Sequence, residues 1–151
     1  MIRASIVRGA LDVKALSNEA ASPDCGATAL FLGTVRSENE GRSVDGIEYS
    51  AYEEMAEREM LTILEETSAR YSIHSAIVEH RIGALDVGEA SIAVVVAHPH
   101  RGAAMDALRY IVDETKARAP IWKREKYSDG TREWVDPSGR PAAPAHAGEG
   151  R

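Results

Sequence analysis

The stretch Ser91–Lys126, SIAVVVAHPHRGAAMDALRYIVDETKARAPIWKREK, contains three structural patterns in succession. Residues 91–97 form an apolar, β-prone run that is typical of a buried strand. Residues 102–118 repeat apolar side chains at helical spacing, and one face of this predicted helix carries Ala104, Ala107, Leu108, Ile111, Val112 and Thr115. Pro120 ends the helix, because proline lacks the backbone N–H that a helix requires. Residues 121–126 then begin another strand.

The sequence on either side predicts further strands and helices. The additional strands span residues 2–7, 27–35, 44–51, 76–82 and 131–135. The last of them pairs with residues 121–126 in a hairpin across Ser128-Asp129-Gly130. Asp12 is a candidate N-cap for a short helix through Leu16. Residues 53–70 predict a longer helix, with a core face of Ala56, Met60, Ile63, Leu64 and Thr67.

The connections complete the predicted architecture. Residues 37–43 predict a polar loop of a kind that can be mobile, and Gly83 and Gly88 mark a turn. Because strands and helices do not alternate strictly, we predict an α+β fold with a mixed sheet, flanking helices and a C-terminal β-hairpin. Residues 1–136 are predicted to form a single domain. The composition of residues 137–151 predicts a disordered tail.

Composition excludes several classes of protein. Hydrophobic residues make up 44% and charged residues 28%, as in a globular protein. No apolar run approaches the ~20 residues that cross a bilayer, and the N-terminus lacks a signal-peptide core, so a cytoplasmic protein without membrane partners is predicted. The net charge of −6 should repel nucleic acid and anionic membranes.

Cysteine and histidine do not indicate a metal site. The single cysteine, Cys25, excludes an internal disulfide and is interpreted as a small, at least half-buried filler. His98 and His100 have no third ligand at suitable spacing, so no metal and no cofactor are predicted. His80 alternates with core positions on a strand and is interpreted as a hydrogen-bonded structural histidine.

Basic residues gather at junctions between predicted elements, which is informative on an acidic chain. Arg36 follows the strand at residues 27–35. His100 and Arg101 precede the helix at residues 102–118, where free backbone N–H groups and the helix dipole favour a phosphate or carboxylate. The alternative is that both are solvated loop residues.

The densest cluster lies on both sides of the proline break and comprises Lys116, Arg118, Lys123 and Arg124. The helix dipole alone explains cations in the last helical turn, such as Lys116 and Arg118. It does not explain Lys123, which follows a predicted anchor, Trp122, and precedes Glu125, which could orient it. A lysine held near other cations or apolar walls loses its proton more readily and can act as a nucleophile or acid–base group.

Five motifs occur in order within residues 2–135: Phe31-Leu-Gly-Thr-Val-Arg36, Tyr49-Ser-Ala-Tyr-Glu-Glu-Met-Ala56, His80-Arg-Ile-Gly-Ala-Leu-Asp-Val-Gly-Glu89, His100-Arg101 and Lys116-Ala-Arg-Ala-Pro-Ile-Trp-Lys-Arg-Glu125. Together they resemble the large, catalytic subunit of molybdopterin synthase. The resemblance implies an α/β hammerhead fold and a homodimer. It also implies a small ubiquitin-like sulphur-carrier subunit on each large one, with a C-terminal Gly-Gly thiocarboxylate.

The resemblance further implies an activity and its residues. Sulphur would pass from the carrier's thiocarboxylate to cyclic pyranopterin monophosphate, forming the dithiolene of molybdopterin. Lys116 and Lys123 would be the catalytic pair. The substrate-binding residues would be Thr34, Val35, Arg36, His100, Arg101, Lys116, Lys123, Arg124 and Glu125. An anionic substrate is compatible with a basic pocket on an acidic protein, and a carrier-borne sulphur requires no cysteine in this chain.

Helix length adds one prediction about the site. Arg101 and Lys116 lie 15 residues apart on one predicted helix, which separates their backbones by about 22 Å at ~1.5 Å per residue. A small pterin would not span that gap. We therefore expect His100 and Arg101 to serve the pocket that contains Lys116 of the neighbouring subunit.

Two other classes of function compete with this one. A non-catalytic anion-binding or interaction module of the same fold would need the arginines but not the lysine pair. An RNA-binding role is disfavoured by the net charge, by an aromatic content of 5% and by the lack of a stacking platform.

Overall fold

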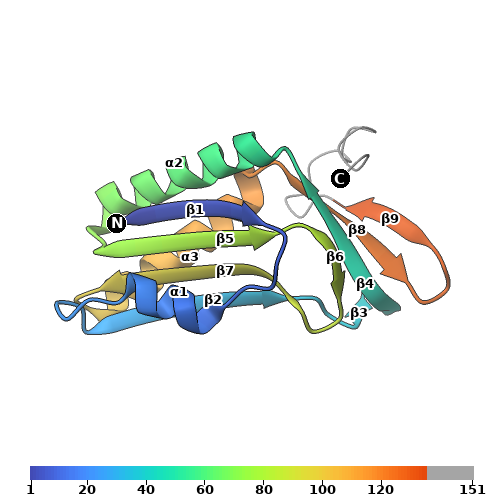
Figure 1. Cartoon of the computed structure of the whole chain (residues 1–151), viewed down its shortest axis with the longest axis horizontal. Coiled ribbons are helices and arrows are strands. Elements are labelled where there is room, and N and C mark those ends of the chain that lie inside the picture. Colours follow the sequence, from blue (N-terminus) through green and yellow to red (C-terminus); the bar gives the residue numbers. More distant parts are fainter. Residues whose placement is uncertain (136–151) are drawn as a thin grey trace.

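The computed structural model describes residues 1–135; the predicted tail and residue 136 of the predicted domain lie outside the described residues. The described part contains three helices and nine strands, which confirms the α+β class and the C-terminal hairpin (Figure 1). The helices are α1 (Val13–Ala20), α2 (Glu53–Tyr71) and α3 (Arg101–Arg118). The strands are β1 (Ile2–Val7), β2 (Ala27–Thr34), β3 (Glu38–Asn39), β4 (Arg42–Ala51), β5 (Ser75–Arg81), β6 (Gly83–Asp86), β7 (Ala90–His98), β8 (Ile121–Tyr127) and β9 (Arg132–Val135).

The first sheet has four strands in the order β1-β5-β7-β2 and carries helices on both faces (Figure 1). It is mixed, because β1 runs parallel to β5 while β7 is antiparallel to both of its neighbours. Alternate residues of β5 and β7 face opposite sides. Val78 and Val94 pack in the main core with Met60 of α2 and Ile111 of α3. Ile77, Ala93 and Val95 instead pack against Leu16 of α1.

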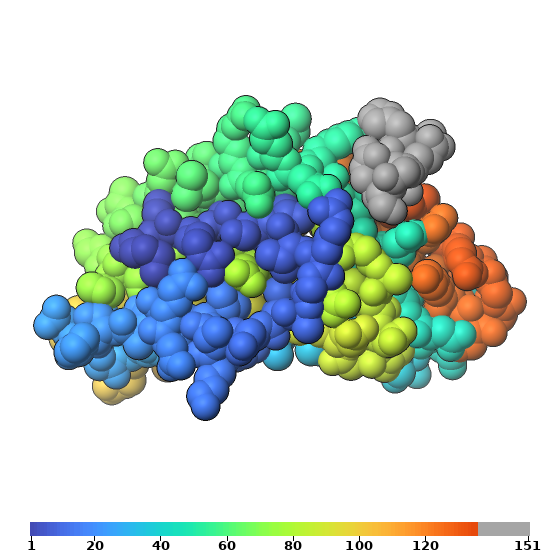
Figure 2. Space-filling view, in the orientation of Figure 1, coloured from blue at the N-terminus to red at the C-terminus, as the bar shows by residue number. Residues whose placement is uncertain are grey.

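The second sheet lies at one end of the first, and its strand β8 begins directly after the proline break. Its order is β3-β4-β8-β9, and β6 also pairs with β4. A smaller core of Val35, Val44, Ile47, Leu85 and Tyr127 holds it together. In the space-filling view, the β8–β9 hairpin projects beyond the body that β1 and α1 cover (Figure 2). The first sheet is the predicted mixed sheet, and the second is an additional, antiparallel sheet.

Two segments that we expected to be irregular contain strands. The predicted loop 37–43 forms a tight hairpin, in which Asn39 pairs with Arg42. Glu40 and Gly41 both have positive φ (50° and 78°), as the two central residues of a type I′ turn require. The turn predicted between Gly83 and Gly88 contains β6, which pairs with residues 46–49 of β4. Both strands are too short for their sequence periodicity to be distinguished from a loop.

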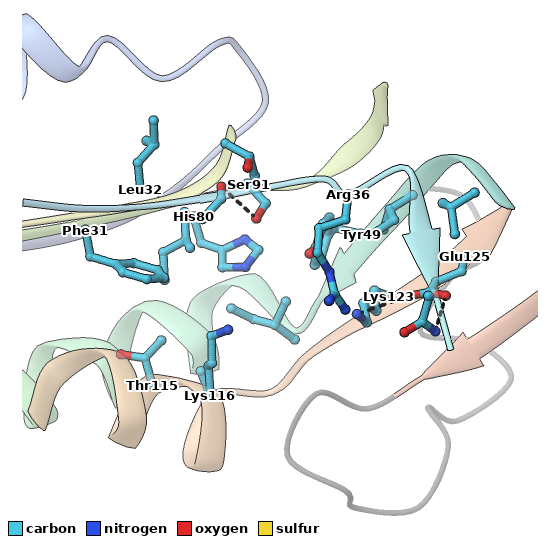
Figure 3. Close-up of a pocket in the computed structure, with 18 of the residues that line it drawn as sticks. Phe31, Leu32, Arg36, Tyr49, His80, Ser91, Thr115, Lys116, Lys123 and Glu125 are labelled. Atoms are coloured by element: carbon cyan, nitrogen blue, oxygen red, sulfur yellow. Dashed lines mark hydrogen bonds and ion pairs between the residues drawn. The ribbon is translucent and has the colours of Figure 1, made fainter. Parts of the chain in front are cut away.

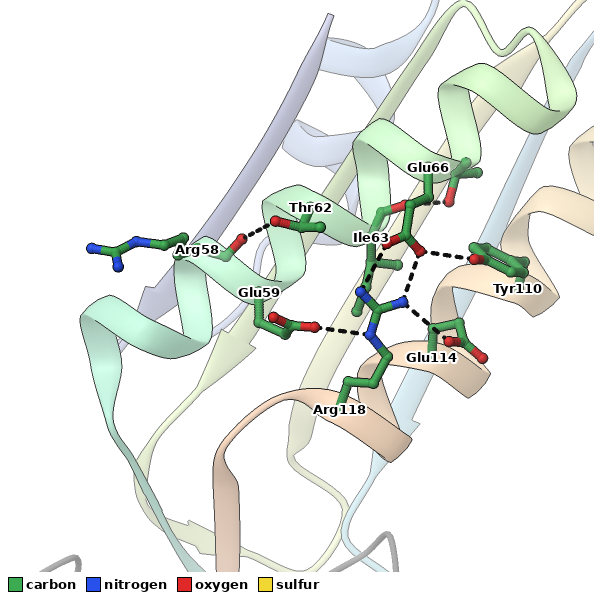
Figure 4. Close-up of polar contacts among 9 residues, drawn as sticks. Arg58, Glu59, Thr62, Ile63, Glu66, Tyr110, Glu114 and Arg118 are labelled. Atoms are coloured by element: carbon green, nitrogen blue, oxygen red, sulfur yellow. Dashed lines mark hydrogen bonds and ion pairs between the residues drawn. The ribbon is translucent and has the colours of Figure 1, made fainter.

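A charged cluster joins α2 to the last turn of α3 (Figure 4). Arg118 donates to Glu59 (2.8 Å), Glu66 (2.7 Å) and Glu114 (3.2 Å), and Tyr110 also donates to Glu66 (2.9 Å). The hydrogen bonds from Arg118 and Tyr110 lower the pKa of Glu66 to about 2. The sequence explained Arg118 by the helix dipole alone. In the structure, its guanidinium also fixes the end of α3 against α2, immediately before the chain turns into β8.

Candidate functional site

A cavity of about 400 Å³ lies between the two sheets and the C-terminal end of α3 (Figure 3). Its walls come from β2, β3, β4, β5, β7, α3 and β8, so segments far apart in the sequence meet there. The polar and aromatic lining residues are Phe31, Thr34, Arg36, Glu38, Asn39, Tyr49, His80, Ser91, Thr115, Lys116, Lys123 and Glu125. Three cations against two acids give the lining a positive balance, on a chain whose net charge is −6.

Both lysines of the predicted pair line this cavity. Lys116 leaves the last turn of α3, and its Nζ lies 5.9 Å from the ring centroid of Phe31, within the range of a cation–π contact. Lys123 lies on β8, and its Nζ is 3.1 Å from Oε1 of Glu125. The intervening break at Pro120 turns the chain from helix to strand, so the two ammonium groups reach one cavity from different elements. Arg36 extends from the end of β2 toward Lys123 (Figure 3).

Glu125 is held by three donors. Its side chain is almost completely buried, with 2% of the residue exposed. Besides the contact with Lys123, its Oε2 accepts hydrogen bonds from Asn39 Nδ2 and from the Tyr127 hydroxyl, each at 2.7 Å. Burial alone would raise the pKa of Glu125, but the hydrogen bonds from Tyr127, Lys123 and Asn39 outweigh it and leave the pKa below its usual value. Glu125 thus contacts Lys123, the lysine that the sequence analysis suggested it could orient.

His80 forms part of the cavity wall although it was interpreted as structural. It is 7% exposed, and its Nδ1 lies 2.9 Å from the backbone carbonyl of Arg81. Because a carbonyl only accepts, Nδ1 carries the proton in this contact. Burial, with a smaller contribution from the nearby charge of Lys116, lowers the pKa of His80 to about 4, against the raising effect of the hydrogen bond to the Arg81 carbonyl. The neutral ring packs edge-on against Tyr49, with centroids 5.0 Å apart. His80 is therefore a hydrogen-bonded histidine, as the sequence analysis expected, and it also lines the cavity.

Not every predicted substrate-binding residue reaches the cavity. Thr34 and Arg36 line it, whereas Val35 between them is buried in the core of the second sheet. Arg124 alternates with Lys123 along β8, so it lies on the opposite face of the strand, where it pairs with Glu48 and lies 5.2 Å from the Trp134 ring.

His100 and Arg101 lie at the other end of α3 from Lys116. Both are exposed, and neither lines the cavity. His98 fixes the entry to the helix, because its Nδ1 accepts from the His100 backbone N–H at 2.9 Å. α3 is continuous from Arg101 to Arg118, so the separation of about 22 Å worked out from the sequence applies within one chain.

The sequence analysis assigned no role in the site to Phe31, Asn39 or Tyr49, which also line the cavity. Asn39 belongs to a segment that we expected to be a loop. Phe31 and Tyr49 begin two of the quoted motifs, but nothing in those motifs shows that they face a cavity, because that depends on how the two sheets meet. Among residues 1–135, no group of three or more histidine, cysteine, aspartate or glutamate side chains could hold a metal ion. No helix in that part of the chain is long and apolar enough to cross a membrane.

The fold and the site define a class: an α+β protein with a two-lysine, cation-lined cavity between a helix end and a second sheet. Residues 6–118 match the family model described as MoaE protein. The chain is 47% identical over 115 residues to the molybdopterin synthase catalytic subunit of Pyrococcus abyssi, covering 76% of this chain and 77% of that one. It is 41% identical to the same subunit of Thermoplasma volcanium, covering 79% and 87%. The chain belongs to the MoaE family.

Solved structures agree with this family. Molybdopterin synthase from Staphylococcus aureus superposes with a TM-score of 0.83 at 29% identity, covering 87% of this chain and 95% of that one. A complex of subunits 1 and 2 of molybdopterin-converting factor from Helicobacter pylori gives 0.69 at 25% identity, covering 92% and 94%. The chain spans 62% of the length of the rat relative, which is 40% identical over 82% of this chain, and 66% of the bovine one.

Proposed function

We propose that this chain is the catalytic subunit of a molybdopterin synthase. It would transfer sulphur from the thiocarboxylated C-terminus of a small carrier subunit to cyclic pyranopterin monophosphate, forming the molybdopterin dithiolene. The observation that carries the proposal is that Lys116 and Lys123 line one cavity in a member of the MoaE family. A binding module of the same fold would not need both amines at one cavity.

The lysines suit the charge changes of such a transfer. A thiocarboxylate is anionic, and attack at a carbonyl carbon produces an oxyanion that nearby ammonium groups stabilise. A lysine can also protonate the oxygen that leaves the pterin precursor. Glu125 holds Lys123 by one oxygen, while Lys116 lies beside an aromatic ring and a neutral histidine. Their different surroundings support a division of labour between the two.

The cavity also suits the substrate's anion. Arg36 is exposed at the cavity edge and ends in a guanidinium, which binds phosphate oxygens by two hydrogen bonds. His100 and Arg101 are too distant to act on the same pocket from within one chain. We therefore propose that a second copy of the chain supplies them. Arg124 faces away from the cavity, so a contact with the carrier or the second copy suits it better than a contact with the pterin.

The partners follow from the same chemistry. The relative from Helicobacter pylori is a complex of two subunits of molybdopterin-converting factor. A carrier chain with a Gly-Gly C-terminus is narrow enough to thread into a cavity, since glycine has no side chain. We propose that such a thiocarboxylated tail enters this cavity beside Lys123.

A reconstituted assay tests the proposal. The purified chain is mixed with a thiocarboxylated carrier and the cyclic phosphate precursor, and molybdopterin is measured as its fluorescent oxidation product. Lys116→Ala and Lys123→Ala should each lower the rate at least 100-fold, as expected for loss of one charge-stabilising group. Lys126→Ala is the matched control, because Lys126 lies on β8 outside the cavity lining. No product from the unaltered chain would leave the binding module as the better explanation.

A further inference from the structure

The two oxygens of Glu125 are divided between two tasks. Oε1 contacts Lys123 Nζ at 3.1 Å. Oε2 accepts from Asn39 and from Tyr127, both at 2.7 Å, and Asn39 Nδ2 also lies 3.3 Å from the Tyr127 hydroxyl. Asn39 and Tyr127 therefore occupy one side of the carboxylate and leave the other side to the lysine.

This division matters because the carboxylate is buried. An ion pair removed from water is stable only when further hydrogen bonds replace the lost hydration. Lys123 provides a single contact, and its own side chain is 20% exposed. The Asn39 amide and the Tyr127 hydroxyl provide the other two contacts. Without them, the carboxylate would rotate or take up a proton, and Lys123 would lose its fixed partner.

Both donors depend on the hairpin that β3 forms with β4. Asn39 is the last residue of the two-residue strand β3, whose ladder contains only two residue pairs. Arg42, on the other side of the turn, stacks its guanidinium over the Tyr127 ring at 3.5 Å. The hairpin thus holds Glu125 directly through Asn39 and indirectly through Tyr127. The hairpin also begins shortly after Arg36. One segment therefore supplies a cation of the cavity, Arg36, and the side chain of Asn39, which holds Glu125 beside a second cation, Lys123.

We propose that Asn39 and Tyr127 are positioning residues that fix the ammonium group of Lys123 by holding the Glu125 carboxylate. The inference rests on the proposed function for its catalytic consequence, but its structural part does not. Neither side chain needs to touch the substrate. Their effect on the reaction passes entirely through Glu125.

The first experiment removes one donor at a time. Tyr127→Phe deletes only the hydroxyl and keeps the ring beneath Arg42, while Asn39→Leu keeps the approximate shape of the side chain. Each should lower kcat about tenfold with little change in KM, because a misplaced Lys123 affects the transition state more than ground-state binding. Tyr110→Phe is the matched control, since it removes another tyrosine-to-glutamate hydrogen bond, of 2.9 Å, outside the cavity. Its activity should equal that of the unaltered chain.

The second experiment asks whether the effect passes through Glu125. In a Glu125→Gln background, the hydroxyl of Tyr127 no longer holds a carboxylate. In this background Tyr127→Phe should lower kcat less than twofold, whereas in the unaltered chain it should lower kcat about tenfold. Equal losses in both backgrounds would show that the hydroxyl acts by another route, and would overturn the proposal.

A third measurement needs neither substrate nor carrier. The carboxyl carbon of Glu125 is titrated by NMR in the unaltered chain and in Tyr127→Phe. The charged or titratable groups around it are Lys123 and Tyr127 on β8, Arg42 on β4, Glu38 on β3 and the cross-strand Glu133 on β9. Loss of the Tyr127 hydrogen bond should raise the pKa of Glu125, because that bond stabilises the ionised form.

The measurements distinguish failure of this inference from failure of the proposed function. If the unaltered chain forms no molybdopterin but the Glu125 titration moves upward in Tyr127→Phe, the proposed reaction is wrong and the positioning contact stands. If molybdopterin forms and both Tyr127→Phe and Asn39→Leu keep the full kcat, the positioning role is wrong. An unchanged Glu125 titration would also overturn it.

Discussion

Acidification should destabilise the protein through His80. The folded chain holds this imidazole neutral, with its pKa lowered from 6.5 to about 4 by burial. An unfolded chain restores the ordinary pKa, so between pH 6.5 and about 4 the unfolded state binds a proton that the folded state does not. The stability contributed by the neutral ring is therefore present above pH 6.5 and is lost as the pH falls toward 4.

The magnitude follows from the two pKa values. Between pH 7 and pH 5, the linkage predicts that the free energy of unfolding falls by about 2 kcal/mol through His80 alone, and the full loss below pH 4 is about 3 kcal/mol. The interval from pH 7 to pH 5 lies above the range from 4.5 to about 2 in which the stability contributed by the Glu66 carboxylate is lost. The two groups therefore act in separable pH ranges.

Denaturant unfolding at pH 7 and pH 5 measures the effect. His80→Gln removes the titrating ring. Between pH 7 and pH 5, the free energy of unfolding of this variant should therefore lack the fall of about 2 kcal/mol that His80 causes in the unaltered chain. His74→Gln removes an exposed histidine and is the matched control, expected to follow the unaltered chain. An imidazole NMR titration of His80 gives the folded pKa directly. Parallel losses in the unaltered chain and in His80→Gln would refute the argument.

Three further predictions follow from other parts of the structure. Arg118→Met should lower the unfolding free energy by about 1 kcal/mol at low salt and by less in 1 M NaCl, measured by urea unfolding, because its carboxylate partners are partly exposed and screened. Glu40→Asn should raise the free energy of unfolding by about 0.5 kcal/mol or more, since asparagine tolerates the positive φ at this turn position better than glutamate. An unchanged denaturant midpoint would contradict this prediction. An equimolar mixture of Arg101→Ala and Lys116→Ala chains, allowed to exchange subunits, should regain about a quarter of the unaltered molybdopterin synthesis when each variant alone is inactive, because half of the dimers are mixed and each has one intact pocket of two. A pocket built from a single chain would regain none.

Periodic patterns made most of the fold predictable. The buried face predicted for residues 53–70 is the buried face of α2, and the helix predicted at 102–118 differs from α3 by one residue at its start. These predictions succeeded because a long element repeats its burial pattern several times. β3 and β6 have two and four residues, and such short strands are determined by their partner, β4, rather than by their own sequence.

The sequence predicted the charged residues of the site. It did not predict the residues that reach the site only through the pairing of strands. Lys123 is unusual in sequence, because it directly follows a proline break on an acidic chain, whereas Lys116 was assigned to the site by the family resemblance. Asn39 is not unusual at all, and only the register of the β3–β4 hairpin brings it to Glu125. Arg124 shows the reverse case: it is adjacent to Lys123, and strand alternation directs it to the other face.

The length of α3 divides the basic residues into two groups that one chain cannot join. Lys116 lies in the last turn of α3 and lines the cavity. Arg101 lies in the first turn, and its backbone is about 22 Å from that of Lys116. A two-fold dimer could bring the two groups together, because in an isologous interface both chains use the same surface patch. Each chain would then supply Arg101 to the pocket of the other. If the Arg101 end of each α3 meets the cavity of the other chain, one interface completes two pockets. Both sites would then depend on the same contact, so weakening the dimer should reduce the catalytic rate in proportion to the dimer lost.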